Sequence, residues 1–170
     1  MSGAGAPETK KTPSAPGRRR AARLAAVQAL YQLDLGGDEV EAVILEFHTH
    51  RLTKGPARAA DPALFADLVR GTWRRQVEID LLLSKVLVAG WPLERLESVL
   101  RALLRAAAYE LLVRLDIPPK VVINEYLEVT HAFFNQREPQ LVNGVLNALA
   151  GRLRGERFAD GAHGEAADGG

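Results

Sequence analysis

Apolar side chains recur at spacings of three and four residues along most of the chain. This repeat is the one that places them on a single face of an α-helix. The sequence has no strand-like alternation of useful length and no internal repeat. Because each such helix must bury its apolar stripe against its neighbours, the pattern predicts an all-α protein, a compact bundle of six or seven helices.

Glycine and proline residues divide this pattern into separate helices. Gly36-Gly37 ends a first helix expected over residues 18–35, and a shorter helix is expected over 38–50. Asp61-Pro62, a capping residue followed by proline at the first helical position, predicts the start of one long helix that ends near Gly90. The remaining helices are expected to start after Pro92, after Pro118-Pro119 and at Glu138-Pro139.

The two ends of the chain differ in composition from the middle. Residues 1–17 are mainly Gly, Ala, Pro, Ser and Thr with two lysines, and residues 155–170 form a second polar, glycine-containing segment. Such segments offer too little apolar surface to fold by themselves. We therefore expect a disordered leader over 1–17, one helical domain over 18–154 and a disordered tail over 155–170.

The sequence carries few of the groups that catalysis or metal binding requires. It has no cysteine and no glycine-rich turn following a strand, which a bound nucleotide cofactor would need. Glu128 and His131 stand three residues apart, but a helical di-iron site needs a second such pair and two further glutamates. We therefore expect a protein that is not an enzyme, with no catalytic residue, no cofactor and no metal.

The sequence also lacks signals for secretion or membrane insertion. No long apolar stretch follows the arginines near the start of the chain, as a secretory signal would require. The most apolar run, residues 81–91, contains Ser84 and Lys85 and is too short to span a bilayer. Together with the missing cysteines, these observations lead us to expect a soluble cytoplasmic protein.

The net charge is only +1, but positive charges are concentrated near the start of the chain. From Lys10 to Arg23 there are six basic residues and no acidic one. The arginines fall in the first turns of the first expected helix, where each cation opposes the helix dipole by about 0.3–1 kcal/mol. Helix stability therefore does not explain them, whereas guanidinium groups bind phosphates and stack on bases. The pattern favours nucleic-acid binding, and a solvated basic helix end is the alternative.

Four stretches of the sequence form a recognisable series. The first is an arginine-rich start that runs into a Val-Gln-Ala-Leu-Tyr helix, and the others lie in the middle and in the C-terminal third. They are residues 19–31 (RRAARLAAVQALY), Leu104-Arg105 with Tyr109-Glu110-Leu111, residues 117–125 (IPPKVVINE) and residues 142–146 (VNGVL). In order and in spacing these four stretches resemble the NusB family, and the resemblance covers about residues 18–153.

The resemblance implies a transcription antitermination factor. Members of the NusB family pair with NusE, a protein of the small ribosomal subunit, and the pair binds single-stranded boxA RNA of ribosomal RNA operons. The resulting complex keeps RNA polymerase transcribing past terminators. Both monomers and homodimers occur in the family.

The resemblance also implies which residues contact RNA. The arginine-rich motif of the family falls on Arg18, Arg19, Arg20 and Arg23. Lys120, in the Pro-Pro-Lys turn, is a second candidate phosphate contact.

Two further RNA-binding candidates depart from the family's pattern, and one residue is a candidate partner contact. Leu141 stands where many relatives have an aromatic residue against RNA, so a stacking platform worth about 1–3 kcal/mol per base is missing. Arg137 stands in the preceding loop where relatives often carry an acid, and its positive charge compensates in part. Tyr31 is a candidate contact for NusE, and the alternative is that it is a core residue.

Two other functions fit the same residues. A NusB-like helical domain also forms the N-terminal part of a ribosomal RNA cytosine methyltransferase, although this sequence ends soon after its last expected helix. Alternatively, the chain is a helical adaptor whose arginines bind an acidic protein.

Overall fold

A computed structural model describes residues 15–54, 60–88 and 91–155. Within these ranges the chain is helical and contains no strand, so the predicted all-α bundle is confirmed. The α-helices are α1 (Ala15–Leu35), α2 (Val40–Glu46), α3 (Pro62–Arg74), α4 (Gln76–Val86), α5 (Ser98–Val113), α6 (Pro119–Phe133) and α7 (Glu138–Arg154). A π-helical turn η1 (Phe47–Arg51) extends α2, and a 3₁₀ turn η3 (Leu93–Arg95) precedes α5.

Most of the predicted leader and most of the predicted tail lie outside the described part of the chain. Residues 1–14 of the predicted leader and residues 156–170 of the predicted tail are not described. Helix α1 begins at Ala15, three residues before the start that the sequence predicts. None of the described helices is long and apolar enough to cross a membrane.

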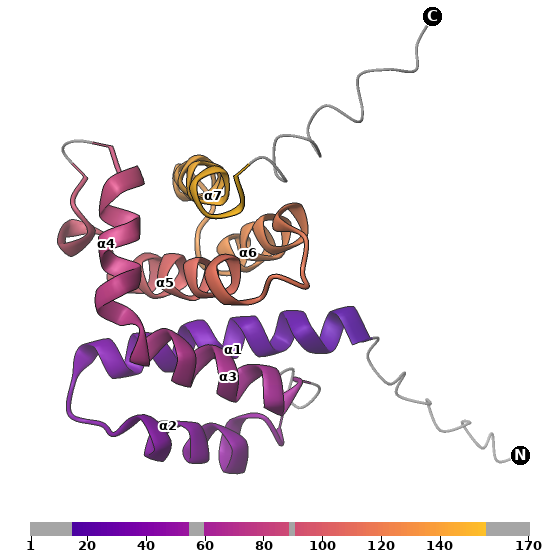
Figure 1. Cartoon of the computed structure of the whole chain (residues 1–170). Helices are drawn as coiled ribbons and strands as arrows, with labels where there is room; N and C mark the ends of the chain where they lie inside the picture. The colour runs from indigo at the N-terminus through magenta and orange to yellow at the C-terminus, as the bar shows by residue number, and fades with distance from the viewer. Residues whose placement is uncertain (1–14, 55–59, 89–90, 156–170) are drawn as a thin grey trace, which may run out of the picture.

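Helix α1 runs through the middle of the bundle, with α2 and α3 on one side and α5 and α6 on the other (Figure 1). Its inward face is built mainly from alanines, which let neighbouring helices approach closely. Helix α5 is the most deeply buried element and contacts α1, α3, α4, α6 and α7. The buried residues of all these helices form one continuous core.

Local sequence accounts for the ends of several helices. After Leu35 the chain continues through Gly36 and Gly37, whose φ angles of 88° and 96° suit glycine and end α1. Asp61 caps α3, because its Oδ1 accepts hydrogen bonds from the backbone N–H groups of Ala63 and Leu64 at 3.0 and 3.1 Å. The predicted cap at Asp61 is therefore confirmed.

The prediction of a single long helix from Asp61-Pro62 to Gly90 is wrong. The chain forms two helices, α3 and α4, separated at Arg75, whose φ and ψ angles of −100° and 15° lie outside the α-helical range. Figure 1 shows α4 leaving α3 at a steep angle. The break has a packing reason, since α3 lies along α1 whereas α4 turns to pack on α5 and α7.

A network of ion pairs joins the C-terminal end of α1 to α4 and α5. Asp34 accepts hydrogen bonds from Arg101 Nη2 at 2.6 Å and from Arg105 Nη1 at 3.2 Å. Arg105 also donates to both carboxylate oxygens of Asp80, at 2.8 and 2.9 Å. Burial raises the pKa of Asp34, but the hydrogen bond from Arg101 and the nearby guanidinium charges more than offset this and hold it below its ordinary value. The network therefore stays charged and fixes three helices at one end of the core.

Helices α3 and α5 approach each other closely at Gly71. A Cβ atom added to Gly71 would overlap the hydroxyl end of the Tyr109 ring. The Tyr109 hydroxyl donates to Asp67 Oδ1 at 2.8 Å, so the ring is held in place. Burial and this hydrogen bond raise the pKa of Tyr109 to about 12. Gly71 is therefore needed for space rather than for a special backbone conformation.

We expect Gly71→Ala to lower the free energy of unfolding, with a typical overpacking cost of ~1–3 kcal/mol. In an unobstructed helix the same change would stabilise by ~0.5–1 kcal/mol. Gly144→Ala is the matched control, because Gly144 lies inside α7 with no atom within 4 Å of an added Cβ. Urea denaturation of both variants checks the prediction. A Gly71→Ala protein as stable as the wild type would mean that Tyr109 moves aside without cost.

Candidate nucleic-acid interface

The N-terminal end of α1 presents three adjacent arginines to solvent. Arg18, Arg19 and Arg20 are all exposed. Among the described residues, no carboxylate lies within ion-pair distance of Arg18 or Arg19. Both guanidinium groups therefore project from a helix end whose dipole disfavours positive charge.

Arg20 is exposed but has a carboxylate partner on α6. Its Nε and Nη2 donate to the two oxygens of Glu125, both at 3.1 Å. The hydrogen bond to Glu125 raises the pKa of Arg20 above its ordinary value. Half of the Arg20 side chain remains exposed (50%), so the paired guanidinium still offers a face to an external phosphate.

Arg23 does not belong with the predicted RNA-binding residues, because its side chain lies in the core. It is 2% exposed, and its Nε and Nη2 donate to Glu110 of α5 at 2.8 and 3.0 Å. Glu110 itself is completely buried. An arginine enclosed in this way cannot reach an external phosphate, so Arg23 belongs to the fold and not to the interface.

The surroundings keep the Arg23–Glu110 pair charged. Burial lowers the pKa of Arg23, but the hydrogen bonds and charge of Glu110 outweigh burial, so the pKa lies above its ordinary value. Glu125 adds a second carboxylate 3.8 Å from Arg23 Nη1. Complete burial, together with the charge of Glu110, holds the pKa of the neighbouring Tyr126 well above its usual range. The pair thus joins α1 to α5 through two charge-assisted hydrogen bonds inside the core.

Lys120 and the exposed arginines lie at the same end of the bundle. Lys120 is exposed in the first turn of α6. Arg19 of α1 lines a pocket together with Asp116 and Ile117, which lie just before α6. In addition, the Arg18 carbonyl accepts a hydrogen bond from the Asp61 backbone N–H at 3.1 Å, which fixes the first turn of α1 against the start of α3.

Arg137 and Leu141 lie at the opposite end of α6. Arg137 is exposed immediately before α7, and Leu141 is half-buried against the core. Most of the length of α6 lies between them and Lys120, a distance of roughly 20 Å. The predicted RNA-binding residues therefore fall into two groups, one at each end of α6.

Tyr31 lies in a third place, on the C-terminal half of α1. It is half-buried, packs against the core and lines a pocket of about 350 Å³. The other lining residues come from α1, η1, α5 and α6, and they are Gln28, Gln32, Leu35, Arg51, Val99 and Phe133. The side chain is thus partly a core residue and partly available to a partner.

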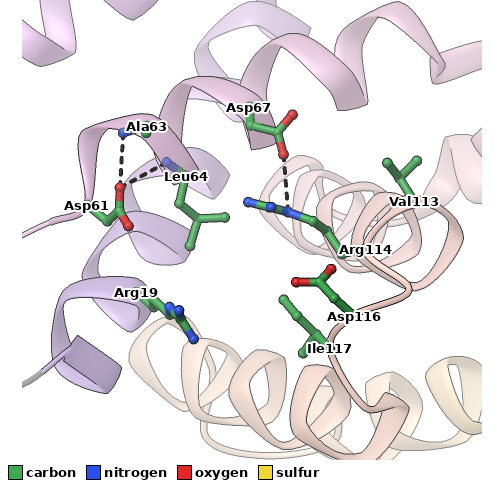
Figure 2. A pocket seen from close by; sticks show the side chains of 9 residues that line it. All are labelled: Arg19, Asp61, Ala63, Leu64, Asp67, Val113, Arg114, Asp116 and Ile117. Atoms are coloured by element: carbon green, nitrogen blue, oxygen red, sulfur yellow. Dashed lines mark hydrogen bonds and ion pairs between the residues drawn. The ribbon is translucent and has the colours of Figure 1, made fainter.

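A pocket of about 660 Å³ lies beside the arginine end of α1, and sequence analysis did not find it (Figure 2). Its charged groups are Arg19, Arg114 and three aspartates from α3 and the α5–α6 turn. Arg114 Nε forms an ion pair with Asp67 Oδ2 at 3.3 Å. The pocket residues come from three segments that lie far apart in the sequence, and no short motif connects these segments.

Comparison with known proteins assigns the family. Residues 20–151 match the sequence model of the NusB family. The chain is 47% identical to the transcription antitermination protein NusB of Agrobacterium fabrum over 143 residues, which covers 82% of this chain and 87% of the relative. It is 48% identical to the protein of the same name from Bradyrhizobium sp. (strain ORS 278) over 145 residues, covering 83% and 86%.

Solved structures agree with this assignment. The chain superposes on T. maritima NusB with a TM-score of 0.69 at 30% identity, covering 88% of this chain and 99% of that one. It also superposes on a chain from a crystal structure of the antitermination factors NusB and NusE in complex with double-stranded RNA, with a TM-score of 0.66 at 26% identity and coverage of 79% and 97%. The sequence and the fold lead to the same conclusion: the chain belongs to the NusB family of transcription antitermination factors, which are not enzymes.

Proposed function

We propose that this protein binds single-stranded RNA through the arginine end of α1 and acts in transcription antitermination together with a NusE-type ribosomal protein. The observation that carries the proposal is the exposure of Arg18, Arg19 and Arg20 at a helix N-terminus. The solved complex of NusB and NusE with double-stranded RNA, which contains a chain similar to this one, supports RNA and NusE as partners.

The placement of these arginines contrasts with that of the arginines in the core. Arg23 and Arg105 are buried and each is held by carboxylates through two or more hydrogen bonds. Arg18 and Arg19 have no such partner among the described residues. A positive group that opposes the helix dipole and lacks an internal partner is suited to an external anion. An RNA backbone supplies such anions in series.

Lys120, Arg137 and Leu141 extend this proposal along α6. Lys120 would add a phosphate contact near the three arginines, and Arg137 would add another roughly 20 Å away. Leu141 would offer an aliphatic surface in place of an aromatic ring, so base stacking there would be weak. An RNA strand contacting both groups would therefore run along α6.

The cellular setting that we propose follows the family resemblance of the sequence. The RNA would be a boxA-like element of ribosomal RNA operons, and the assembly would include RNA polymerase. We also propose a cytoplasmic location, where such an assembly would form on nascent RNA, with the protein present as a monomer or a homodimer. The pocket beside Tyr31 is the surface that we propose for NusE.

We expect the triple variant Arg18→Ala, Arg19→Ala, Arg20→Ala to bind RNA more weakly while keeping its helix content. If these arginines, Lys120 and Arg137 each neutralise one phosphate, the log–log salt slope for single strands is about −3.5 in the wild type, from about −0.7 per contact. The same relation predicts about −1.4 in the variant, where Lys120 and Arg137 remain. Fluorescence anisotropy with a labelled RNA strand at several salt concentrations measures both slopes.

The matched control removes three exposed arginines from other surfaces. Arg74, Arg95 and Arg152 are exposed on α3, η3 and α7, and changing them to Ala alters the net charge by the same amount. The control variant should keep the wild-type salt slope. Equal weakening in both variants would mean that RNA responds to net charge alone, and an unlabelled duplex competitor would show whether single strands are preferred.

A further inference from the structure

The pocket next to Arg19 is enclosed by three elements that converge beside the arginine end of α1. It is lined by α1, the start of α3 and the turn between α5 and α6 (Figure 2). Its volume of about 660 Å³ is within the usual range for small-ligand sites, about 300–1,000 Å³. The pocket can therefore accept a group as large as a single nucleobase.

The walls of this pocket combine apolar and charged side chains. Leu64, Val113 and Ile117 provide aliphatic surface, which suits the faces of a planar ring. Figure 2 shows Arg19 pointing into the pocket from α1, with Arg114 and Asp116 on the opposite side. The faces of a base would thus contact aliphatic side chains, and its edge would contact charged ones.

Two of the three aspartates in the pocket are already engaged. Asp61 Oδ1 caps α3 by accepting from two backbone N–H groups. Asp67 accepts from the Tyr109 hydroxyl and forms an ion pair with Arg114. Asp116 is exposed in the α5–α6 turn and makes no hydrogen bond to any residue in the described part of the chain. Asp116 is therefore the carboxylate that can accept hydrogen bonds from a ligand.

The charges of the pocket select against phosphate and for hydrogen-bond donors. Three carboxylates face two guanidinium groups, so the lining is negative overall. A phosphate inside it would be repelled, whereas a neutral base that presents N–H groups would be attracted. Guanine presents two adjacent donors, N1–H and the N2 amino group, in the parallel arrangement that a carboxylate accepts. Uracil presents a single N–H.

We propose that this pocket is a guanine subsite for the RNA strand held by Arg18, Arg19 and Arg20. Asp116 accepts the guanine N1–H and N2–H hydrogen bonds, and Arg19 at the edge of the pocket contacts the adjoining phosphate. This inference rests on the proposed function, because it requires RNA at the arginine end of α1. It adds base recognition to a surface whose other contacts are to phosphates, which carry no sequence information.

The test uses three RNA probes with the full-length protein. The probes are a labelled twelve-nucleotide oligouridylate and two versions of it with one central guanosine or one central inosine. Inosine keeps N1–H and lacks only the N2 amino group. We expect the guanosine probe to bind about tenfold more tightly than the inosine probe, since one bidentate base contact discriminates by about that factor or more.

Asp116→Asn should bring the guanosine and inosine affinities together, because an amide has only one acceptor oxygen. Its affinity for plain oligouridylate should not fall. Asp38→Asn is the matched control, since Asp38 is exposed in the loop after α1, at the other end of that helix, and the charge change is the same. The control should keep the preference for guanosine.

The outcomes separate the two proposals. Equal affinity of the wild type for all three probes, with weaker binding by the Arg18, Arg19 and Arg20 triple variant, would overturn the guanine subsite and leave RNA binding intact. A guanosine preference that survives in Asp116→Asn would also overturn the subsite. Failure of the wild type to bind any probe would overturn the proposed RNA binding and the subsite with it.

Discussion

Arg23→Ala is expected to lower the free energy of unfolding by about 3–5 kcal/mol, the usual cost of removing one member of a buried ion pair. The variant would leave Glu110, which is fully buried, without the two hydrogen bonds from Arg23. A buried carboxylate without a partner pays the full cost of its lost hydration. Urea denaturation followed by circular dichroism measures the loss. Arg152→Ala, on an exposed side chain of α7, should change stability by less than about 0.5 kcal/mol.

A double variant separates the cost of leaving the Glu110 carboxylate unpaired from the cost of lost packing. Replacing the pair by apolar residues, in Arg23→Met with Glu110→Leu, should recover most of the stability, because a well-packed apolar pair is often neutral or better. The same double variant should bind RNA with wild-type affinity, since Arg23 does not reach the surface. Weakened RNA binding in a fully folded double variant would contradict this.

Saturating NusE is expected to tighten RNA binding by about 5–150-fold, the usual range for coupled sites. The physical reason is that the arginine end of α1 supplies mainly phosphate contacts, which are independent of sequence. Reading a single strand also requires bases held by their faces or edges, and aromatic residues make up only 6% of this chain. A composite surface with NusE would supply further contacts.

Thermodynamic linkage makes this prediction reciprocal. RNA must tighten NusE binding by the same factor. Anisotropy with labelled RNA, with and without NusE, and calorimetry of NusE binding, with and without RNA, measure the two halves. The Arg18, Arg19 and Arg20 triple variant is the control, because it should lose RNA affinity and keep its affinity for NusE alone. Identical RNA affinities with and without NusE would show that each partner binds independently.

The helical fold was predictable because several helix ends are encoded locally. Gly36-Gly37, Asp61-Pro62 and Pro118-Pro119 each combine a residue that stops or caps a helix with the expected change in apolar spacing, and the structure has helix ends at all three. The break between α3 and α4 has no such signal. The residues around Arg75 include no glycine or proline, and apolar spacing continues across them. The bend arises because α3 and α4 pack on different neighbouring helices, and these contacts exist only in the folded core.

The candidate site was predictable only in part, and Arg23 shows why. Its spacing from Arg19 and Arg20 suggests one basic surface, but its spacing from Ala26, Val27 and Leu30 places it equally well on the buried stripe. Whether the Arg23 side chain is buried or exposed depends on its partner Glu110, which lies 87 residues away in the sequence. The presence of a glutamate on an otherwise apolar helix face was a feature of the sequence that could have indicated a buried partner. The pocket containing Asp116 depends on three separate segments and could not be found from spacing at all.

The hydrogen bond from the Asp61 N–H to the Arg18 carbonyl bears on the entropy of RNA binding. A frayed helix end would have to order its backbone when a ligand arrives, at ~1–2 kcal/mol per residue. Here the first turn of α1 is fastened to α3 beforehand, so mainly side-chain rotamers remain to be restricted. The backbone at the arginine end of α1 is therefore preorganised for binding. As a result, a larger part of the free energy of each phosphate contact contributes to RNA affinity.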